Sequence, residues 1–206
     1  MGYLQRKADL FLQAWKRDPD RYPLIIKGAR QVGKTETIRR FAAENYAQLI
    51  EINFITEPVY KSIIEEGFSA DSITKLISRI DPGKKFRPGE TLIFFDEIQD
   101  FPEIATSLKF FREDGRYDVI CSGSLLGVQY HRIASISVGY KMDYPMYSMD
   151  FEEFLWAKGY AADVIDDMLQ HMLSETAFST TEHTMYSTLF LEYCILGGMP
   201  AIVQNY

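Results

Sequence analysis

The chain has 206 residues, of which 47% are hydrophobic and 25% are charged, a composition typical of globular proteins with enough apolar material for a core. Its formal net charge of −7 excludes a uniformly basic surface for nucleic acid, although a local basic patch is compatible with it. No stretch provides the roughly 18 apolar residues that cross a bilayer, and the first residues do not resemble a signal peptide, so we expect a cytoplasmic protein without membrane contact.

Strand and helix patterns alternate along the chain. Apolar strands are predicted over 23–28, 47–54, 91–97 and 117–124, with a fifth within 141–149. Helices are predicted over 1–15, 34–46, 57–67, 69–80, 102–114 and 150–159, and near 161–174 and 181–196. Ser69 and Asp150 are suitable N-caps for two of these helices, and 127–140 is predicted to be a loop. This alternation predicts an α/β protein with a mainly parallel sheet covered by helices on both faces.

Cysteine and histidine give no sign of a disulfide or a metal site. The two cysteines, Cys121 and Cys194, are far apart, so we expect both to be reduced residues of the core. The three histidines are scattered and lack a cysteine or aspartate at ligand spacing, so surface or packing roles are expected for His131, His171 and His183.

The segment GARQVGKT, residues 28–35, fits the phosphate-binding pattern G-x-x-x-x-G-K-[ST] at every fixed position. Its glycines let the backbone approach phosphate, and the following helix N-terminus adds to an anion cradle. The alternative is an ordinary turn before a helix, which the flanking strand and helix patterns disfavour. Lys34 can reach the β- and γ-phosphates, and the Thr35 hydroxyl is placed to bind magnesium. We predict nucleotide binding by Gly28, Ala29, Arg30, Gln31, Val32, Gly33, Lys34, Thr35 and Glu36.

The segment LIFFDEIQ, residues 92–99, has the Walker B pattern of four apolar residues before an acid. Asp96 is predicted to hold Mg²⁺ together with Thr35, and Glu97 to orient or deprotonate the attacking water. The alternative is that both acids merely end a strand. Because ligands bind at the carboxyl ends of parallel strands, the phosphate loop, this acid pair and the turn at 122–124 should share one edge.

Two further roles are less sharply defined by the sequence. At the turn after the fourth strand, Ser124 is the first choice for contact with the γ-phosphate or the water, and Ser122 is the alternate; either also fits a plain turn. Together with Lys34 and Glu97, Ser124 completes the predicted catalytic set. A transition-state arginine has three candidates that spacing does not separate: Arg112, Arg116 and Arg132.

The chain resembles the AAA-superfamily ATPases of bacteria and archaea in which the ATPase domain precedes a C-terminal domain of unknown function. The resemblance is carried by PLIIKGARQVGKT, IEINF, TLIFFDEIQ, SLKFFREDGRYDVICSGSLLG, YPMYSMDFEEFLWA and GGMP. It implies a three-layer P-loop NTPase fold with a five-stranded sheet in the order 5-1-4-3-2. It also implies ATP and Mg²⁺ as cofactors, with the site residues already named. We expect an ATPase core over 1–149, including an N-terminal helix over 1–20, and a helical extension over 150–206.

The chain departs from this family in two places. Where many relatives have Gly-Arg, it reads Tyr140-Lys141, which puts an arginine role there in doubt. Relatives also continue beyond GGMP, so we expect this chain to be a fragment that lacks a C-terminal portion.

Three functions are compatible with the sequence. The leading hypothesis is an ATP-hydrolysing switch or motor, with an arginine supplied by self-association or a partner protein. The second is a nucleotide-dependent binding or scaffolding module with negligible turnover, which would not need Glu97. The third is a nucleic-acid remodelling ATPase, which the negative charge does not support.

Overall fold

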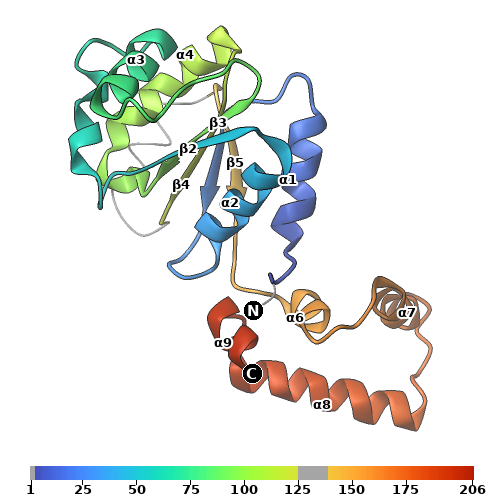
Figure 1. Ribbon diagram of the computed structural model, residues 1–206. Coiled ribbons are helices and arrows are strands. Elements are labelled where there is room, and N and C mark those ends of the chain that lie inside the picture. Colours follow the sequence, from blue (N-terminus) through green and yellow to red (C-terminus); the bar gives the residue numbers. More distant parts are fainter. Residues whose placement is uncertain (1–2, 125–138) are drawn as a thin grey trace.

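The centre of the molecule is a parallel five-stranded sheet (Figure 1) in a computed structural model that describes residues 3–124 and 139–206. Its strands are β1 (Leu24–Lys27), β2 (Gln48–Asn53), β3 (Thr91–Asp96), β4 (Asp118–Gly123) and β5 (Met142–Pro145). They lie in the order β2-β3-β4-β1-β5, and every neighbouring pair is parallel. This is the predicted order 5-1-4-3-2 seen from the other edge, so the predicted fold is confirmed.

Helices cover both faces of the sheet (Figure 1). The helices α1 (Lys7–Arg17) and α2 (Lys34–Asn45) pack on one face, in a cluster that includes Leu12, Phe41 and Phe94. The other face carries α3 (Ala70–Ile80), α4 (Ser107–Asp114) and the 3₁₀ helices η1 (Pro58–Ile64), η2 (Ile98–Asp100) and η3 (Pro102–Thr106). Strand β3 is buried along its whole length because it lies inside the sheet between these two layers.

Several helix boundaries differ from the predictions. The first helix begins at Lys7, where the Asp9 carboxylate accepts a hydrogen bond of 2.8 Å from the backbone N–H of Arg6. The segment predicted as a helix over 57–67 is the 3₁₀ helix η1, and the helix predicted over 102–114 opens with the 3₁₀ turn η3. Tight turns of this kind are common where helices begin, and a proline opens both. The Ser69 and Asp150 caps are confirmed.

The chain continues from β5 into α6 (Phe151–Ala157), α7 (Ala162–Leu173), α8 (Thr180–Leu196) and α9 (Pro200–Asn205). These helices lie beyond the carboxyl ends of the strands (Figure 1). Helices α6, α8 and α9 share a small apolar cluster around Met149, Phe154 and Val203. Within the described residues, α7 has no buried side chain and α8 buries only Tyr186. Cys194 in α8 is exposed, so its expected place in the core was wrong, whereas Cys121 in β4 is buried.

The described part of the chain contains no helix with the length and apolar character that crossing a membrane requires. The loop predicted over 127–140 falls largely outside the described residues.

Candidate nucleotide-binding site

The phosphate loop joins the end of β1 to the start of α2, and two glycines are required by its geometry. Gly33 is the N-cap of α2 and has φ of 98°, in the left-handed region that glycine adopts without a Cβ penalty. Gly28 lies against the backbone after β5, where a Cβ would stand 2.1 Å from the carbonyl oxygen of Met146. Gly28 therefore has a packing requirement that the motif alone did not indicate.

The Lys34 side chain folds back into this loop. Its Nζ donates to the carbonyl oxygen of Gly28 at 2.9 Å and to that of Ala29 at 2.8 Å, and only 8% of the residue is exposed. Burial lowers the pKa of Lys34, while the carboxylates of Glu97 and Asp96 act in the opposite direction. The loop lysine and the acid pair predicted from separate segments therefore share one site.

The Asp96 carboxylate at the end of β3 is buried and held by several donors. The Thr35 hydroxyl lies 3.1 Å from its Oδ2, and the Asn53 side-chain amide lies 3.3 Å from the same oxygen. Its Oδ1 accepts hydrogen bonds from the Ser122 hydroxyl and from the backbone N–H of Glu97. These contacts fix one carboxylate oxygen beside the first turn of α2. Oxygen donors of this kind suit Mg²⁺, so the side chains present fit that ion.

The two serines at the end of β4 differ in their contacts. Ser122 is fully buried and donates its hydroxyl to Asp96. Ser124 donates its backbone N–H to Oε1 of Gln99 at 3.2 Å. The structure thus brings the alternate serine, rather than the first choice, into contact with the acid. Sequence could not separate them, because residues two apart on a strand point to the same face.

Glu97 is held by a residue that the sequence reasoning missed. Glu97 has φ of 55°, a left-handed conformation that is uncommon for a residue with a side chain. The Gln99 amide donates Nε2 to the Glu97 carboxylate, while its Oε1 accepts from Ser124. A Cβ on Gly123 would stand 2.9 Å from that Oε1, so a side chain at this position would displace the Gln99 amide. The amide therefore connects Glu97 to the end of β4.

Both missed residues carried a faint sequence signal. Asn53 is the polar last residue of β2, and Gln99 lies three residues after the end of β3, so both are near the sheet edge where ligands bind. A lone polar residue after a strand is also typical of an ordinary turn, so the pattern did not single them out.

The arginine candidates do not gather at this edge. Arg112 and Arg116 lie where the chain enters β4, at the amino ends of the strands. Arg116 pairs with Asp114 and Asp71, and Arg112 lies 3.9 Å from Asp20. Arg132 lies outside the described residues. The ammonium of Lys141 lies 2.6 Å from Asp143.

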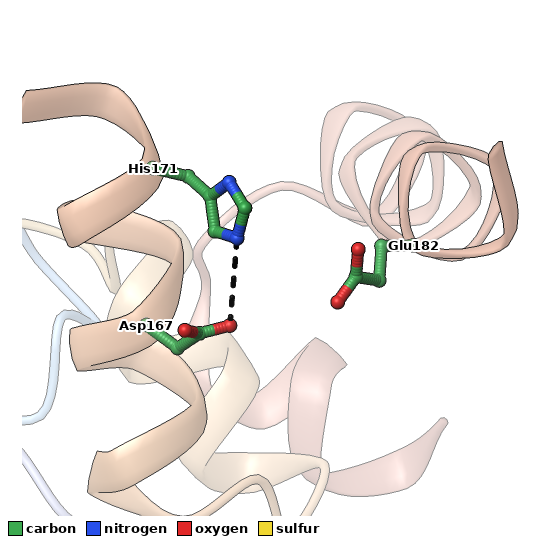
Figure 2. A group of neighbouring side chains, drawn as sticks. All are labelled: Asp167, His171 and Glu182. Carbon is green, nitrogen blue, oxygen red and sulfur yellow. Dashed lines mark ion pairs between the residues drawn. The ribbon is translucent and has the colours of Figure 1, made fainter. Parts of the chain in front are cut away.

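A histidine and two carboxylates lie together between α7 and α8 (Figure 2). The ligand atoms of Asp167, His171 and Glu182 lie within 4.8 Å of one another, so the expectation of no aspartate at ligand spacing was wrong for His171. Nε2 of His171 lies 4.0 Å from Asp167, four residues earlier on the same helix. Glu182 is used as a helix cap, and hydrogen bonds from Ser179 lower its pKa. Helix capping and an exposed ion pair account for this cluster without a metal.

A cavity of about 410 Å³ opens beside the phosphate loop, next to the first turn of α2. The segment before α1, the start of α2 and the helix α9 all contribute to it. Its lining residues are Tyr3, Leu4, Arg6, Gly33, Glu36, Thr37, Pro200 and Gln204. The phosphate loop thus has a concave space adjoining it, with both polar and apolar walls.

The parallel sheet, the glycine loop before α2 and the acid at the end of β3 define a P-loop module of the α/β class. A protein-family model described as "AAA domain" matches residues 20–155, which is more than half of the chain. The chain belongs to this AAA domain family, and the family implies an ATP-binding P-loop module.

No curated protein matches the chain. Among solved structures, it is similar to one described as "Structure of C. elegans PCH-2", with 12% sequence identity and a TM-score of 0.42. That match covers 87% of this chain and 50% of the other, so the present chain spans half the length of that solved chain.

Proposed function

We propose that this chain binds ATP with Mg²⁺ in the phosphate loop and hydrolyses it, as a nucleotide-driven switch or motor module. The observation that carries the proposal is the Thr35–Asp96 contact of 3.1 Å beside the loop lysine, because it joins the two halves of the predicted site. AAA domains generally bind ATP with Mg²⁺, and the family is typically one of ATPases.

The phosphates are assigned to the loop residues 28–36. Successive backbone N–H groups and the N-terminus of α2 favour an anion there. The Lys34 ammonium now bonds to two loop carbonyls, and on binding it would exchange these for phosphate oxygens. Mg²⁺, when bound, would be held by Thr35 and Asp96 and would neutralise charge on the β- and γ-phosphates.

Glu97 is assigned to the attacking water. Its carboxylate faces Lys34 closely enough to act on the pKa of the lysine, and the Gln99 amide holds its position. A carboxylate beside the γ-phosphate can orient or deprotonate water. Ser122 and Ser124 stand as alternatives for the polar contact at the end of β4. The geometry favours Ser122, whose hydroxyl already bonds to Asp96.

The cavity beside the loop is assigned to the adenosine half of the nucleotide. It adjoins Gly33 and Thr37 at the start of α2, and the segment before α1 and the helix α9 line its other sides. The Tyr3 hydroxyl, which bonds to Asp9 and Thr37, is among its polar groups. A base bound there would therefore contact the ATPase core and the C-terminal helices at the same time.

The proposal includes the division into an ATPase core over 1–149 and a helical extension over 150–206. This boundary lies between the last strand, β5, and the first helix of the extension, α6, and Leu4 and Met149 of the core pack in the apolar cluster of the extension. A cytoplasmic location, and an arginine supplied by a second copy or a partner protein, also belong to the proposal. A binding module with negligible turnover is the alternative, which the acid pair at the site disfavours.

The experiment is a titration of the purified chain with a fluorescent ATP analogue and Mg²⁺, followed by measurement of phosphate release with and without DNA or RNA. Saturable binding and phosphate release unaffected by nucleic acid support the switch or motor. Binding without phosphate release supports the scaffolding module. Strong stimulation that falls steeply with salt supports nucleic-acid remodelling.

A further inference from the structure

Arg6 is a buried arginine at the wall of the cavity beside the phosphate loop, and its guanidinium contacts the loop itself. It lies directly before α1, and only 4% of it is exposed. Its Nη1 donates to the carbonyl oxygen of Val32, within the phosphate loop, at 2.6 Å. A Cβ built on the next residue, Gly33, would stand 3.3 Å from the same nitrogen. A guanidinium from the N-terminal segment therefore lies against the back of the phosphate loop.

The contact with Val32 fixes one peptide plane of the loop. In a trans peptide the carbonyl and the following N–H point in opposite directions. Because the Val32 carbonyl faces Arg6, the N–H of Gly33 faces away from Arg6, on the opposite side of the loop backbone. An anion cradle consists of N–H groups that point the same way, so the orientation of this peptide decides whether Gly33 contributes to it.

The same guanidinium is anchored on its other side to the start of the helical extension. Its Nη2 donates to the carbonyl oxygen of Tyr147 at 2.8 Å, and its Nε lies 3.2 Å from Oε1 of Glu153 in α6. Glu153 is also 4% exposed, and it accepts a 2.6 Å hydrogen bond from the backbone N–H of Lys7. Arg6 therefore joins the phosphate loop, the segment after β5 and α6 in one buried contact.

We propose that Arg6 is a positioning residue of the nucleotide site, which holds the Val32–Gly33 peptide of the phosphate loop in its anion-binding orientation. This inference rests on the proposed nucleotide binding at the loop. Arginine is the residue type that this place requires, since its planar fork donates to two carbonyls in fixed directions while its charge lies beside the Glu153 carboxylate. Lysine would keep the charge beside Glu153 but could not make all three contacts in that geometry.

The test compares nucleotide affinity in four variants and the parent chain, at a temperature where circular dichroism shows each to be folded. Arg6→Gln removes the charge and most of the planar fork. Arg6→Lys removes the fork but keeps the charge beside Glu153, so it can be tested even if Arg6→Gln does not fold. Glu153→Gln disrupts the same buried pair but leaves the contact with Val32. Lys7→Ala is the matched control, because Lys7 adjoins Arg6 but pairs with Asp150 and Glu152 at the surface.

Titration with a fluorescent ATP analogue should show Arg6→Gln and Arg6→Lys binding at least about tenfold more weakly than the parent, the scale of one charge-assisted hydrogen bond. Glu153→Gln and Lys7→Ala should stay within about threefold. A second readout needs no nucleotide: hydrogen exchange of the peptide covering residues 28–36 should be faster in Arg6→Lys and unchanged in Lys7→Ala.

Two results overturn the inference. One is parent affinity in a folded Arg6→Lys or Arg6→Gln variant. The other is an equal loss of affinity in Glu153→Gln, because the effect would then follow the stability of the buried pair and not the loop peptide. Titration of the parent chain distinguishes failure of this inference from failure of the proposed function. If the parent binds the analogue and the Arg6 variants bind it equally well, only the role of Arg6 is contradicted. If the parent does not bind the analogue, the proposed function itself is contradicted.

Discussion

The Thr35 hydroxyl lies 3.1 Å from Oδ2 of Asp96, although 61 residues separate them in the sequence. Thr35 is in the first turn of α2, and Asp96 ends β3, which is separated from β1 by β4. The parallel sheet brings them together because both follow the carboxyl ends of strands. This pair is where the phosphate loop meets the acid that would hold its metal.

Asp96→Asn should weaken nucleotide binding in a magnesium-dependent manner. The carboxylate supplies the negative charge of the metal site, and an amide of the same shape does not. We expect affinity for an ATP analogue to fall about tenfold or more with Mg²⁺ present, and to change little with EDTA. Asp100→Asn, a nearby acid, is the control and should bind as the parent does. An equal loss of affinity with and without Mg²⁺ would contradict the metal role of Asp96.

Glu97→Gln should separate binding from hydrolysis. The substitution keeps the size of the side chain and removes the group that activates water, so affinity should persist while phosphate release slows at least about 100-fold. Single-turnover measurements with saturating ATP and Mg²⁺ check this. Turnover at the parent rate would show that Glu97 is not the water-activating residue.

The chain alone should hydrolyse ATP slowly, on the order of 10⁻³ s⁻¹ per site, because a transition-state cation is worth roughly 10³–10⁵ in rate. Among the described residues, Arg112 and Arg116 lie at the amino ends of the strands, and Lys141 pairs with Asp143. Replacing Arg112 or Arg116 by alanine should therefore leave the rate unchanged at low protein concentration. Turnover near 1 s⁻¹ would contradict this expectation, and Arg132 would then be the first residue to mutate.

Asp118→Asn should destabilise the fold in a pH-dependent manner. Burial raises the pKa of Asp118, but hydrogen bonds from Arg21, Tyr46 and Lys16 outweigh this and hold it below the ordinary 3.8. Because the pKa of Asp118 is lower in the folded protein than in the unfolded chain, its carboxylate stabilises the fold. This stabilisation is fully present above the pKa of the unfolded chain and is lost as the pH falls through the pKa of the folded protein. The variant should lose about 2 kcal/mol in free energy of unfolding at pH 7.

Urea unfolding of the parent and of Asp118→Asn between pH 7 and pH 3 checks this. The free energy of unfolding of the parent should exceed that of the variant by a constant amount down to about pH 4, and this difference should then shrink as Asp118 protonates. A difference that grows on acidification would contradict the sign of the shift.

The strands and the phosphate loop could be predicted because both leave strong local patterns, whereas the order of the strands was implied only by the resemblance to AAA-superfamily ATPases. Strand β3 is apolar at four successive positions before Asp96, and residues 28–35 match a fixed spacing. The helix α9 was missed because Pro200 and two preceding glycines are typical of a turn. The pairing of Ser122 with Asp96 depends on the depth of each serine in the sheet, which no spacing indicates. Arg6 was missed because an arginine on a polar helix end is usually a solvated charge.

The central claim is that the phosphate loop holds ATP through Lys34, and isothermal titration of the parent and of Lys34→Ala with ATP and Mg²⁺ tests it most directly. The hydrogen bonds of the buried Lys34 ammonium go to the Gly28 and Ala29 carbonyls of its own loop, so we expect the variant to stay folded, which circular dichroism checks. Lys75→Ala, which breaks a surface pair with Glu66, is the matched control and should bind as the parent does. We predict saturable binding to the parent and at least about a 100-fold loss in Lys34→Ala, since Lys34 supplies the charge that meets the phosphates. Equal affinity in the parent and in a folded Lys34→Ala variant would contradict the account.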